Sequence, residues 1–200
     1  MAPGRLQERW LRQTADAGLR IVLADGDDAR VREAAPRIVD AGISPLLVTV
    51  GDSAAGLEVI DPRQPGDAVA EVVEGIVDRQ TKKHGLGEEQ RAAMATDPLT
   101  VGVAAVKAGL ADGCVAGASR PSADVARAAI RIVGMAEGRS TLSSSFLMAL
   151  PDRTLAYGDC AVVPEPDAEQ LADIAIATAD TFSALASEEP IVALLPFRTQ

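Results

Sequence analysis

Apolar residues in the first two thirds of the chain fall into short β-branched runs separated by longer stretches with helical spacing. The runs at 20–24 (RIVLA), 45–50 (PLLVTV) and 112–118 (DGCVAGA) predict strands. The stretches with helical spacing are 5–18, 29–42, 67–83 and 98–107. Glycine follows or closes several of these stretches, as is typical of helix ends. The segment between 51 and 67 is rich in Gly, Pro and Asp, which predicts an exposed connection.

The last third of the chain repeats this alternation. A helix is predicted at 122–138, with an inward face formed by Val125, Ala129, Ile132, Val133 and Ala136. Strands are predicted at 141–150 and 154–163. Asp167 followed by Gln170 resembles a capping box, which predicts a further helix. Its inward face would hold Leu171, Ile174, Ala175, Thr178, Phe182 and Leu185. The apolar run PIVALL at 190–195 predicts a final buried strand.

Strand, helix and strand in this order favour right-handed crossovers and a parallel sheet with helices on both faces. We therefore predict an α/β fold. A change in composition near Gly138 predicts a first α/β domain over 1–138 and the start of a second over 139–200.

The composition is that of a folded, acidic protein. Of 200 residues, 48% are hydrophobic but only 2% are aromatic, so we expect an aliphatic core. The net charge of −10 argues against a nucleic-acid binder, which needs a basic face. The sequence shows neither a signal-peptide run nor an apolar run of membrane-spanning length, so we expect a cytoplasmic protein without membrane contact.

Few residues of this chain suit metal or thiol chemistry. The single histidine, His84, excludes a His-rich metal site and lies in a charged run that favours a surface role. Cys114 and Cys160 form no C-x-x-C pair. Asp159 beside Cys160 disfavours a thiolate, so we expect a small buried thiol at this position and no nucleophile.

The strongest candidate for an anion site is the stretch 112–131, where a predicted strand turns into a helix. Small residues would let a ligand approach the backbone, and free N–H groups together with the helix dipole would favour phosphate. Arg120 and Arg127 would add full positive charges. The same spacing also fits a plain turn, with Ser122 as the helix N-cap and Arg127 on the solvated face.

Two other polar clusters are weaker candidates. Ser143, Ser144 and Ser145 could bind a phosphate or carbonyl oxygen, although such serines more often satisfy backbone groups at strand ends. The sequence DGDD at 25–28 carries three carboxylates that would repel phosphate, so we expect a helix-capping turn there.

Read together, three segments resemble the phosphate acetyltransferase family and the related phosphate butyryltransferases. They are RIVLADGDDARVREAAPRIVDAGI, DPLTVGVAAVKAGLADGCVAGASRPSADVARAAIRIV and SSSFLMALPDRTLAYGDCAVVPEPDAEQLADIAIATADT. The third segment is the most specific, because it contains the LPDR turn, the GDCAV strand and a P-x-P-x-A-E-Q-L-A helix start.

The resemblance implies two α/β domains with a cleft, in an architecture like that of isocitrate dehydrogenases. It implies reversible transfer of an acetyl group from coenzyme A to phosphate, with the CoA thioester as substrate and neither cofactor nor metal. Phosphate would attack the thioester directly while a base assists and arginines hold the anions. The enzymes of the family are usually dimeric or larger, which implies a homodimer here.

The resemblance also assigns candidate substrate residues. Ser122, Asp124 and Arg127 fall on positions of the family's active-site cleft, although Ala128 stands where the family usually has proline. Ser144 and Ser145 match a serine pair, and Arg120 replaces a common histidine. A further family arginine corresponds to either Arg79 or Thr81.

The family continues beyond the strand that resembles PIVALL, and its catalytic Ser-Arg-Gly segment has no counterpart in these 200 residues. Catalytic residues are therefore not assigned, and the second domain is expected to be incomplete. Alternatives to an active acetyltransferase are a catalytically silent module that binds CoA or acetyl phosphate, and one half of a split enzyme that needs a complementary C-terminal polypeptide.

Overall fold

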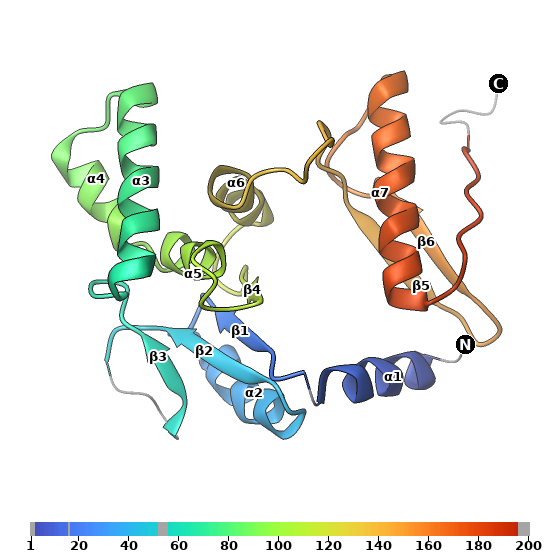
Figure 1. The fold of residues 1–200 in the computed structure, drawn as a ribbon, viewed down its shortest axis with the longest axis horizontal. Coiled ribbons are helices and arrows are strands. Elements are labelled where there is room, and N and C mark those ends of the chain that lie inside the picture. Colours follow the sequence, from blue (N-terminus) through green and yellow to red (C-terminus); the bar gives the residue numbers. More distant parts are fainter. Residues whose placement is uncertain (1–2, 16, 52–55, 196–200) are drawn as a thin grey trace. The chain divides into compact units, whose positions relative to one another are not determined.

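A computed structural model describes residues 3–15, 17–51 and 56–195 (Figure 1). The helices are α1 (Pro3–Ala15), α2 (Ala29–Asp40), α3 (Asp67–His84), α4 (Glu88–Ala95), α5 (Pro98–Lys107), α6 (Ser122–Ile132) and α7 (Ala168–Ala186). The strands are β1 (Arg20–Leu23), β2 (Ser44–Val48), β3 (Glu58–Ile60), β4 (Gly113–Val115), β5 (Ser145–Ala149) and β6 (Thr154–Gly158).

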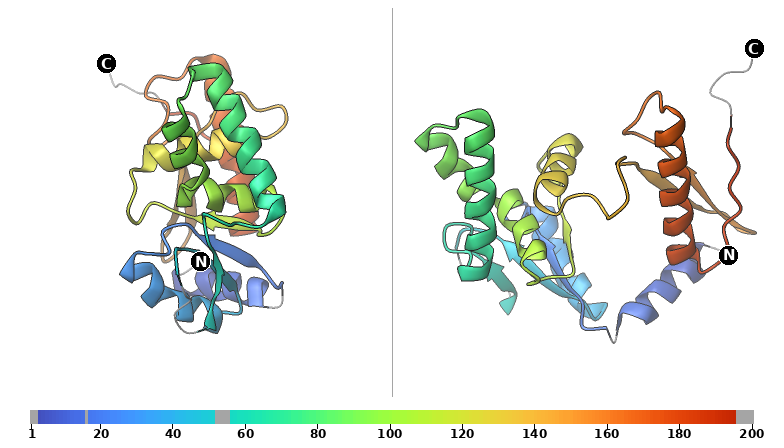
Figure 2. Two further views of the ribbon diagram at one scale, coloured as in Figure 1. Left: turned by 90° about the vertical axis from the view of Figure 1, so that its left-hand side faces the viewer. Right: turned by 45° about the horizontal axis from the view of Figure 1, so that its top comes forward.

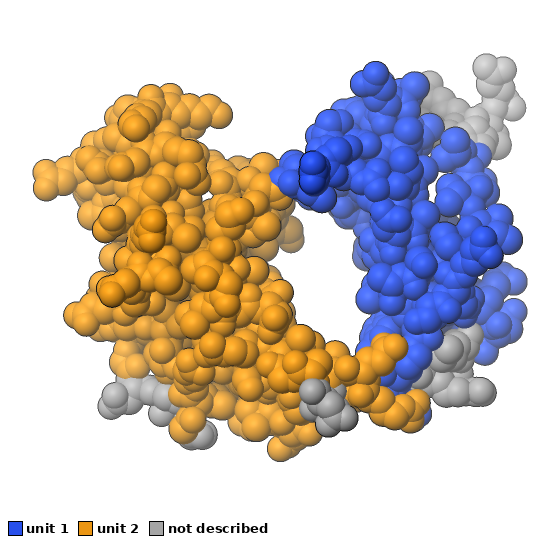
Figure 3. Space-filling view, in the orientation of Figure 1, with its two compact units in different colours: residues 1–10, 135–200 blue, residues 11–134 orange. Residues whose placement is uncertain are grey.

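The chain forms two compact units, which Figure 3 shows in different colours. One unit comprises residues 11–134, and the other comprises residues 1–10 and 135–200. We call them the sheet unit and the hairpin unit. The domain boundary expected near residue 138 stays a prediction.

The sheet unit is built on four parallel strands in the order β3-β2-β1-β4. Ile21 of β1 lies between Pro45 of β2 and Gly113 of β4. After β1 the chain builds the sheet outward in one direction through β2 and β3, and then returns to place β4 on the other side of β1. The sheet order therefore reverses between β1 and β4. The predicted α/β fold with a parallel sheet is confirmed.

Both faces of this sheet are buried, because successive side chains of a strand point to opposite faces. Val22, Leu46 and Val48 face the larger core with α3 and α5, while Leu23 and Leu47 pack against α2 on the other side (Figures 1 and 2). Burying aliphatic side chains of this size stabilises the unit by about 1.5–3 kcal/mol each. Helices on both faces are thus what a continuous apolar strand requires.

The hairpin unit consists of the antiparallel pair β5–β6, helix α7 and the start of α1. The Nε1–H of Trp10 donates a hydrogen bond to the carbonyl oxygen of Leu185 at 2.8 Å. Arg9 donates to the carbonyl oxygen of Ala186 at 2.7 Å, so a cation lies at the negative end of the α7 dipole. Trp10 is the single tryptophan of the chain and therefore reports on this unit.

Local capping signals in the sequence are confirmed. Asp28 and Asp97 accept backbone N–H groups at the starts of α2 and α5. Asp167 and Gln170 form the expected capping box of α7. The acidic turn at 25–28 is thus a helix cap, as predicted.

The final buried strand predicted at 190–195 is wrong. Residues 191–195 form no strand, and Ile191 is 98% exposed. A run of β-branched residues is buried only when other strands lie beside it. In the described part of the hairpin unit the only sheet is the pair β5–β6.

Several predicted elements are shorter than expected, among them β4, β5, β6 and α6. Helix α6 ends at Ile132, because Gly134 has a φ of +93° and its N–H turns back to the carbonyl of Ala129. Of the predicted inward face, Ile132 is buried and Val125 is half-buried, but Ala129, Val133 and Ala136 are exposed, contrary to the prediction. Strand β6 ends at Gly158. The carboxylate of the next residue, Asp159, accepts the backbone N–H groups of Val162 and Val163.

Two short elements were missed. Strand β3 lies in the predicted connection at 51–67, and α4 lies between the predicted helices at 67–83 and 98–107. Three residues of strand and eight of helix carry too little periodicity to be separated from a loop.

Candidate functional site at the reversal of the sheet

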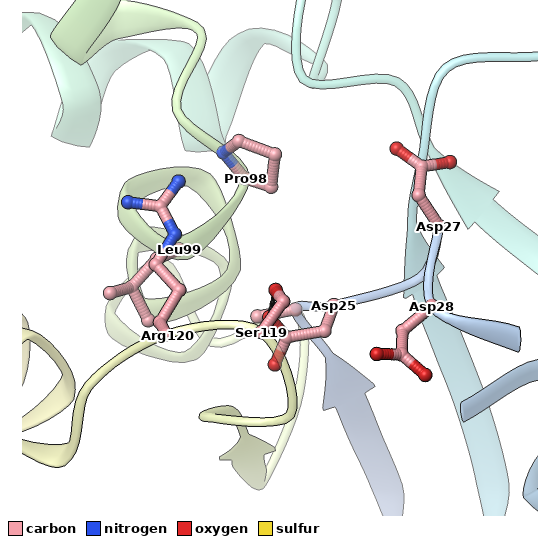
Figure 4. A pocket seen from close by; sticks show the side chains of 8 residues that line it. Asp25, Asp27, Asp28, Pro98, Leu99, Ser119 and Arg120 are labelled. Atoms are coloured by element: carbon pink, nitrogen blue, oxygen red, sulfur yellow. Dashed lines mark hydrogen bonds between the residues drawn. The ribbon is translucent and has the colours of Figure 1, made fainter. Parts of the chain in front are cut away.

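Ligands of open parallel sheets bind beyond the carboxyl ends of the strands, at the point where the strand order reverses. In this sheet that point lies between β1 and β4. A cavity of about 290 Å³ opens there. It is lined by Ala24, Asp25, Asp27, Asp28, Pro98, Leu99, Ser119 and Arg120. Figure 4 shows Asp25 and Ser119 side by side, with Arg120 to one side of them and Asp27 and Asp28 to the other.

Asp25 joins the two strands that border the cavity. Its Oδ2 accepts the N–H groups of Gly117 at 2.8 Å and Ala118 at 3.0 Å, and its Oδ1 accepts the hydroxyl of Ser119. Burial alone would raise the pKa of Asp25, but the Ser119 hydroxyl and the backbone N–H groups outweigh it and lower the pKa. The carboxylate is therefore ionised at neutral pH.

The other two aspartates of this turn are each paired with an arginine of α2. Asp28 binds Arg30, whose side-chain hydrogen bonds lower the pKa of Asp28 to about 2. Asp27 lies 3.0 Å from the guanidinium of Arg32 and also accepts the hydroxyl of Thr49. The negative charges of this turn are thus largely balanced, which weakens the repulsion of phosphate expected from the sequence alone.

Arg120 reaches across the cavity to the start of α5. Its guanidinium pairs with Oδ1 of Asp97, and Oδ2 of the same carboxylate caps α5 through the N–H of Thr100 at 2.9 Å. The pair is partly exposed, with 38% of the Arg120 side chain accessible, so its net stabilisation is about 0–1 kcal/mol. The ion pair with Asp97 therefore holds the Arg120 guanidinium only weakly.

The predicted anion residues of α6 lie at the exposed start of that helix. Ser122 is its first residue, and the N-cap is Pro121, whose side chain makes no capping hydrogen bond. Arg127 is exposed and pairs with Asp124 one turn before it. The N–H groups of Gly117 and Ala118 are not free, contrary to the prediction, because Asp25 occupies them.

The predicted serines belong to the hairpin unit, separate from the unit that holds Arg120 and α6. Ser144 donates its N–H to Oδ1 of Asp159 at 2.7 Å, and its hydroxyl accepts the N–H of Cys160 at 3.0 Å. Asp159 also accepts the N–H of Val162 at 2.9 Å. Ser144 therefore satisfies backbone groups at the strand end, whereas Ser145 begins β5 with an exposed side chain.

The chain is similar to proteins of a known family. The family described as phosphate acetyl/butaryl transferase matches residues 6–200. The chain belongs to this family. The phosphate acetyltransferase of Paracoccus denitrificans is 38% identical over 185 residues, which cover 90% of this chain and 58% of that protein. The Escherichia coli phosphate acetyltransferase is 35% identical over 92% of this chain and 27% of its own length.

Two solved phosphotransacetylases have the same fold. The structure of EutD phosphotransacetylase from Staphylococcus aureus is 29% identical, with a TM-score of 0.78, and the match covers 93% of this chain and 59% of that one. A phosphotransacetylase from Streptococcus pyogenes matches with a TM-score of 0.79 over 93% and 60% of the two chains. The chain thus spans at most about three fifths of these relatives.

In this phosphate acetyl/butaryl transferase chain the two cysteines differ in environment. Burial, helped by the nearby charge of Asp25, raises the pKa of Cys114 to about 11. Cys160 is only partly buried, and its thiol contacts the carbonyl oxygen of Tyr157. The buried thiol expected at this position is therefore only half-buried, and no hydrogen bond from a histidine or cationic side chain to Cys160 is found among the described residues.

Asp25 was predicted only as part of a helix-capping turn, and Arg30 and Asp97 were not predicted as parts of the site. Asp25 could have been found, because it follows a central strand where ligands of parallel sheets gather. Asp97 carried only its capping signal.

None of the helices in the described ranges has the length and apolar character needed to cross a membrane.

Proposed function

We propose that this chain supplies the coenzyme A- and phosphate-binding part of a phosphate acetyltransferase. The reaction is acetyl-CoA plus phosphate giving acetyl phosphate plus CoA, and it is reversible. We place the protein in the cytoplasm and expect a homodimer. Butyryl-CoA is the corresponding alternative substrate, since the family comprises both acyl specificities.

The observation that supports this proposal most is the cavity at the reversal of the sheet. It combines a small-residue loop, a helix start and a guanidinium group at the position where parallel sheets hold their ligands. Among the described residues Arg120 pairs only with Asp97, in a partly exposed ion pair, and the Arg127 side chain is 56% exposed. Both can therefore accept an anion without leaving a buried group unpaired.

In the proposed reaction an oxygen of phosphate attacks the thioester carbonyl carbon. The new C–O bond forms as the C–S bond breaks, and the CoA thiolate leaves and takes up a proton. The role that we propose for Arg120, Arg127 and Ser122 is to hold anionic oxygens, either of phosphate or of CoA. Holding the two reactants together in a reactive geometry lowers the barrier of such a direct transfer by up to about 7–11 kcal/mol.

The test measures acetyl-CoA formation from acetyl phosphate and CoA by thioester absorbance. The 200-residue chain is assayed alone and together with the C-terminal portion of the Paracoccus denitrificans relative that the match does not cover. We expect turnover in the second arm. Absence of turnover in both arms would sink the catalytic proposal.

Calorimetry with acetyl-CoA separates binding from turnover. Replacing Arg127 with alanine should weaken acetyl-CoA or phosphate binding by about tenfold, the cost of one hydrogen-bonded charge. Arg131→Ala is the matched control, because Arg131 is also exposed and lies one turn further along α6. If the two substitutions weaken binding equally, Arg127 is not a specific part of the binding site. Acetyl-CoA binding without turnover in either arm favours the catalytically silent module.

A second candidate function is that of an interaction half that is completed by another polypeptide. It is favoured by a groove of about 500 Å³ along β6, α7 and the extended segment 189–195. Ile191, Leu194 and Leu195 are exposed there, and the hydroxyls of Thr154 and Thr178 in the groove wall are buried without a partner. Urea unfolding followed by tryptophan fluorescence tests this candidate. The C-terminal portion of the relative should raise the midpoint, and an unchanged midpoint would refute the candidate.

A further inference from the structure

The loop after β4 presents a concave set of donors to a single carboxylate. The successive N–H groups of Gly117 and Ala118 point at one oxygen of Asp25, and the hydroxyl of Ser119 points at the other. Successive backbone N–H groups arranged in this way form a nest that binds anions. The anion that occupies this nest is the protein's own Asp25, which lies 92 positions earlier in the chain.

The loop that carries these donors has an unusual backbone conformation. Gly117 has a φ of +105°, a conformation that side chains other than glycine rarely adopt. Arg30 also contacts this loop, because its guanidinium donates a hydrogen bond to the carbonyl oxygen of Ala118 at 2.5 Å. The loop continues directly into Arg120 and into Ser122 at the start of α6.

We propose that Asp25 is a positioning residue, which fills the 117–119 nest as a resident anion and thereby fixes the loop that carries Arg120 and Ser122. A phosphate group is thereby kept out of the nest and directed to the arginine side of the cavity. The nest itself is independent of the proposed function, and only the binding readout below rests on that function.

The first test asks whether Asp25 occupies the nest. In the Asp25→Ala chain, the amide resonances of Gly117 and Ala118 in a ¹H–¹⁵N spectrum should move upfield, because they lose a charged acceptor. Added formate, a small carboxylate, should return them toward their original positions in a saturable way. Formate should leave these amides unchanged in the original chain, whose nest is full.

Asp61→Ala is the matched control. Asp61 follows β3 as Asp25 follows β1, and its carboxylate accepts the N–H and guanidinium of Arg63 within its own loop. Removing it deletes a comparable set of hydrogen bonds without touching the 117–119 loop. If Asp25→Ala fails to fold, Asp25→Asn keeps the side-chain volume and one acceptor, and the same amides are followed.

The second test asks whether the nest positions the binding residues. Asp25→Ala should weaken acetyl-CoA binding about tenfold in calorimetry, and formate at constant ionic strength should restore most of the loss. Asp61→Ala should bind as the original chain does. If the amide resonances of Gly117 and Ala118 change neither with the substitution nor with formate, the proposal that Asp25 fills the nest is refuted. Amides that respond while acetyl-CoA affinity stays unchanged would overturn the positioning role. If the original chain binds no acetyl-CoA, the proposed function fails, while the amide result still decides the nest.

Discussion

Replacing Gly26 with alanine would force a methyl group into the backbone of β2. The added Cβ would lie 2.5 Å from the carbonyl oxygen of Val48, 3.0 Å from its carbonyl carbon and 3.1 Å from its nitrogen. Real Cβ atoms do not approach backbone atoms this closely, and a backbone carbonyl in a paired strand cannot rotate away. The β1–α2 turn must therefore shift, at a cost of about 1–3 kcal/mol.

A second glycine of the same unit gives the opposite expectation. Gly75 lies within α3, and the nearest atom to an added Cβ there is the Arg79 guanidinium nitrogen at 3.6 Å. This is ordinary contact with the end of a flexible side chain. Gly75→Ala should therefore stabilise the chain by about 0.5–1 kcal/mol, because alanine loses less backbone entropy in a helix.

Urea denaturation followed by circular dichroism measures both substitutions. The midpoint should fall for Gly26→Ala and rise for Gly75→Ala. Gly26→Ala should also weaken acetyl-CoA binding, because Gly26 lies between Asp25 and Asp27 in the cavity wall. A Gly26→Ala midpoint equal to that of the original chain would refute the steric reasoning.

Three further outcomes are expected. Gly158→Ala should lower stability by about 1–3 kcal/mol in urea titrations of tryptophan fluorescence, because its Cβ would lie 2.0 Å from Oγ1 and 3.2 Å from Cβ of Thr178. Adding Thr178→Ala should recover most of this loss, and no recovery would contradict the packing argument. Iodoacetamide at about pH 8 should label Cys160 well before Cys114, since a pKa of about 11 leaves roughly one Cys114 thiolate in a thousand; equal labelling in peptide mass spectra would contradict this. For Asp159, burial would raise the pKa, but the hydrogen bonds from Ser144 and the following backbone lower it well below its usual range. The stabilisation of the folded state by ionised Asp159 is therefore fully present above its ordinary pKa of ~3.9. It is lost as the pH falls toward the lower pKa that Asp159 has in the folded state. Asp159→Asn should lose less stability than the original chain between about pH 5 and pH 3, and equal losses would argue against this role.

Elements with a local cause could be predicted from the sequence. The helix that starts after Asp167 needs only its capping box, and α5 needs only Asp97 and Pro98. The segment 190–195 shows the limit of such reasoning. Its apolar pattern indicates a preference for burial, but burial requires neighbouring strands that the described part of the chain does not place beside it.

The candidate site, too, could be predicted from the sequence only in part. The turn at 25–28 and the arginines of the 112–131 stretch were recognised, and so was the resemblance to the family that the comparisons confirm. The spacing of Arg120 and Arg127 could not reveal that each is already paired with a carboxylate. Nor could it reveal that the N–H groups expected to bind phosphate already bind Asp25.

By itself, the sequence determined the α/β class, most of the helices and strands, and the family, because each depends on neighbouring residues or on contiguous motifs. Only the tertiary structure decided what the charged groups of the site bind. The order β3-β2-β1-β4 brings β4 beside β1, and with it Gly117 beside Asp25. Hydrogen bonds between residues 92 positions apart follow from that strand order, which local spacing does not encode.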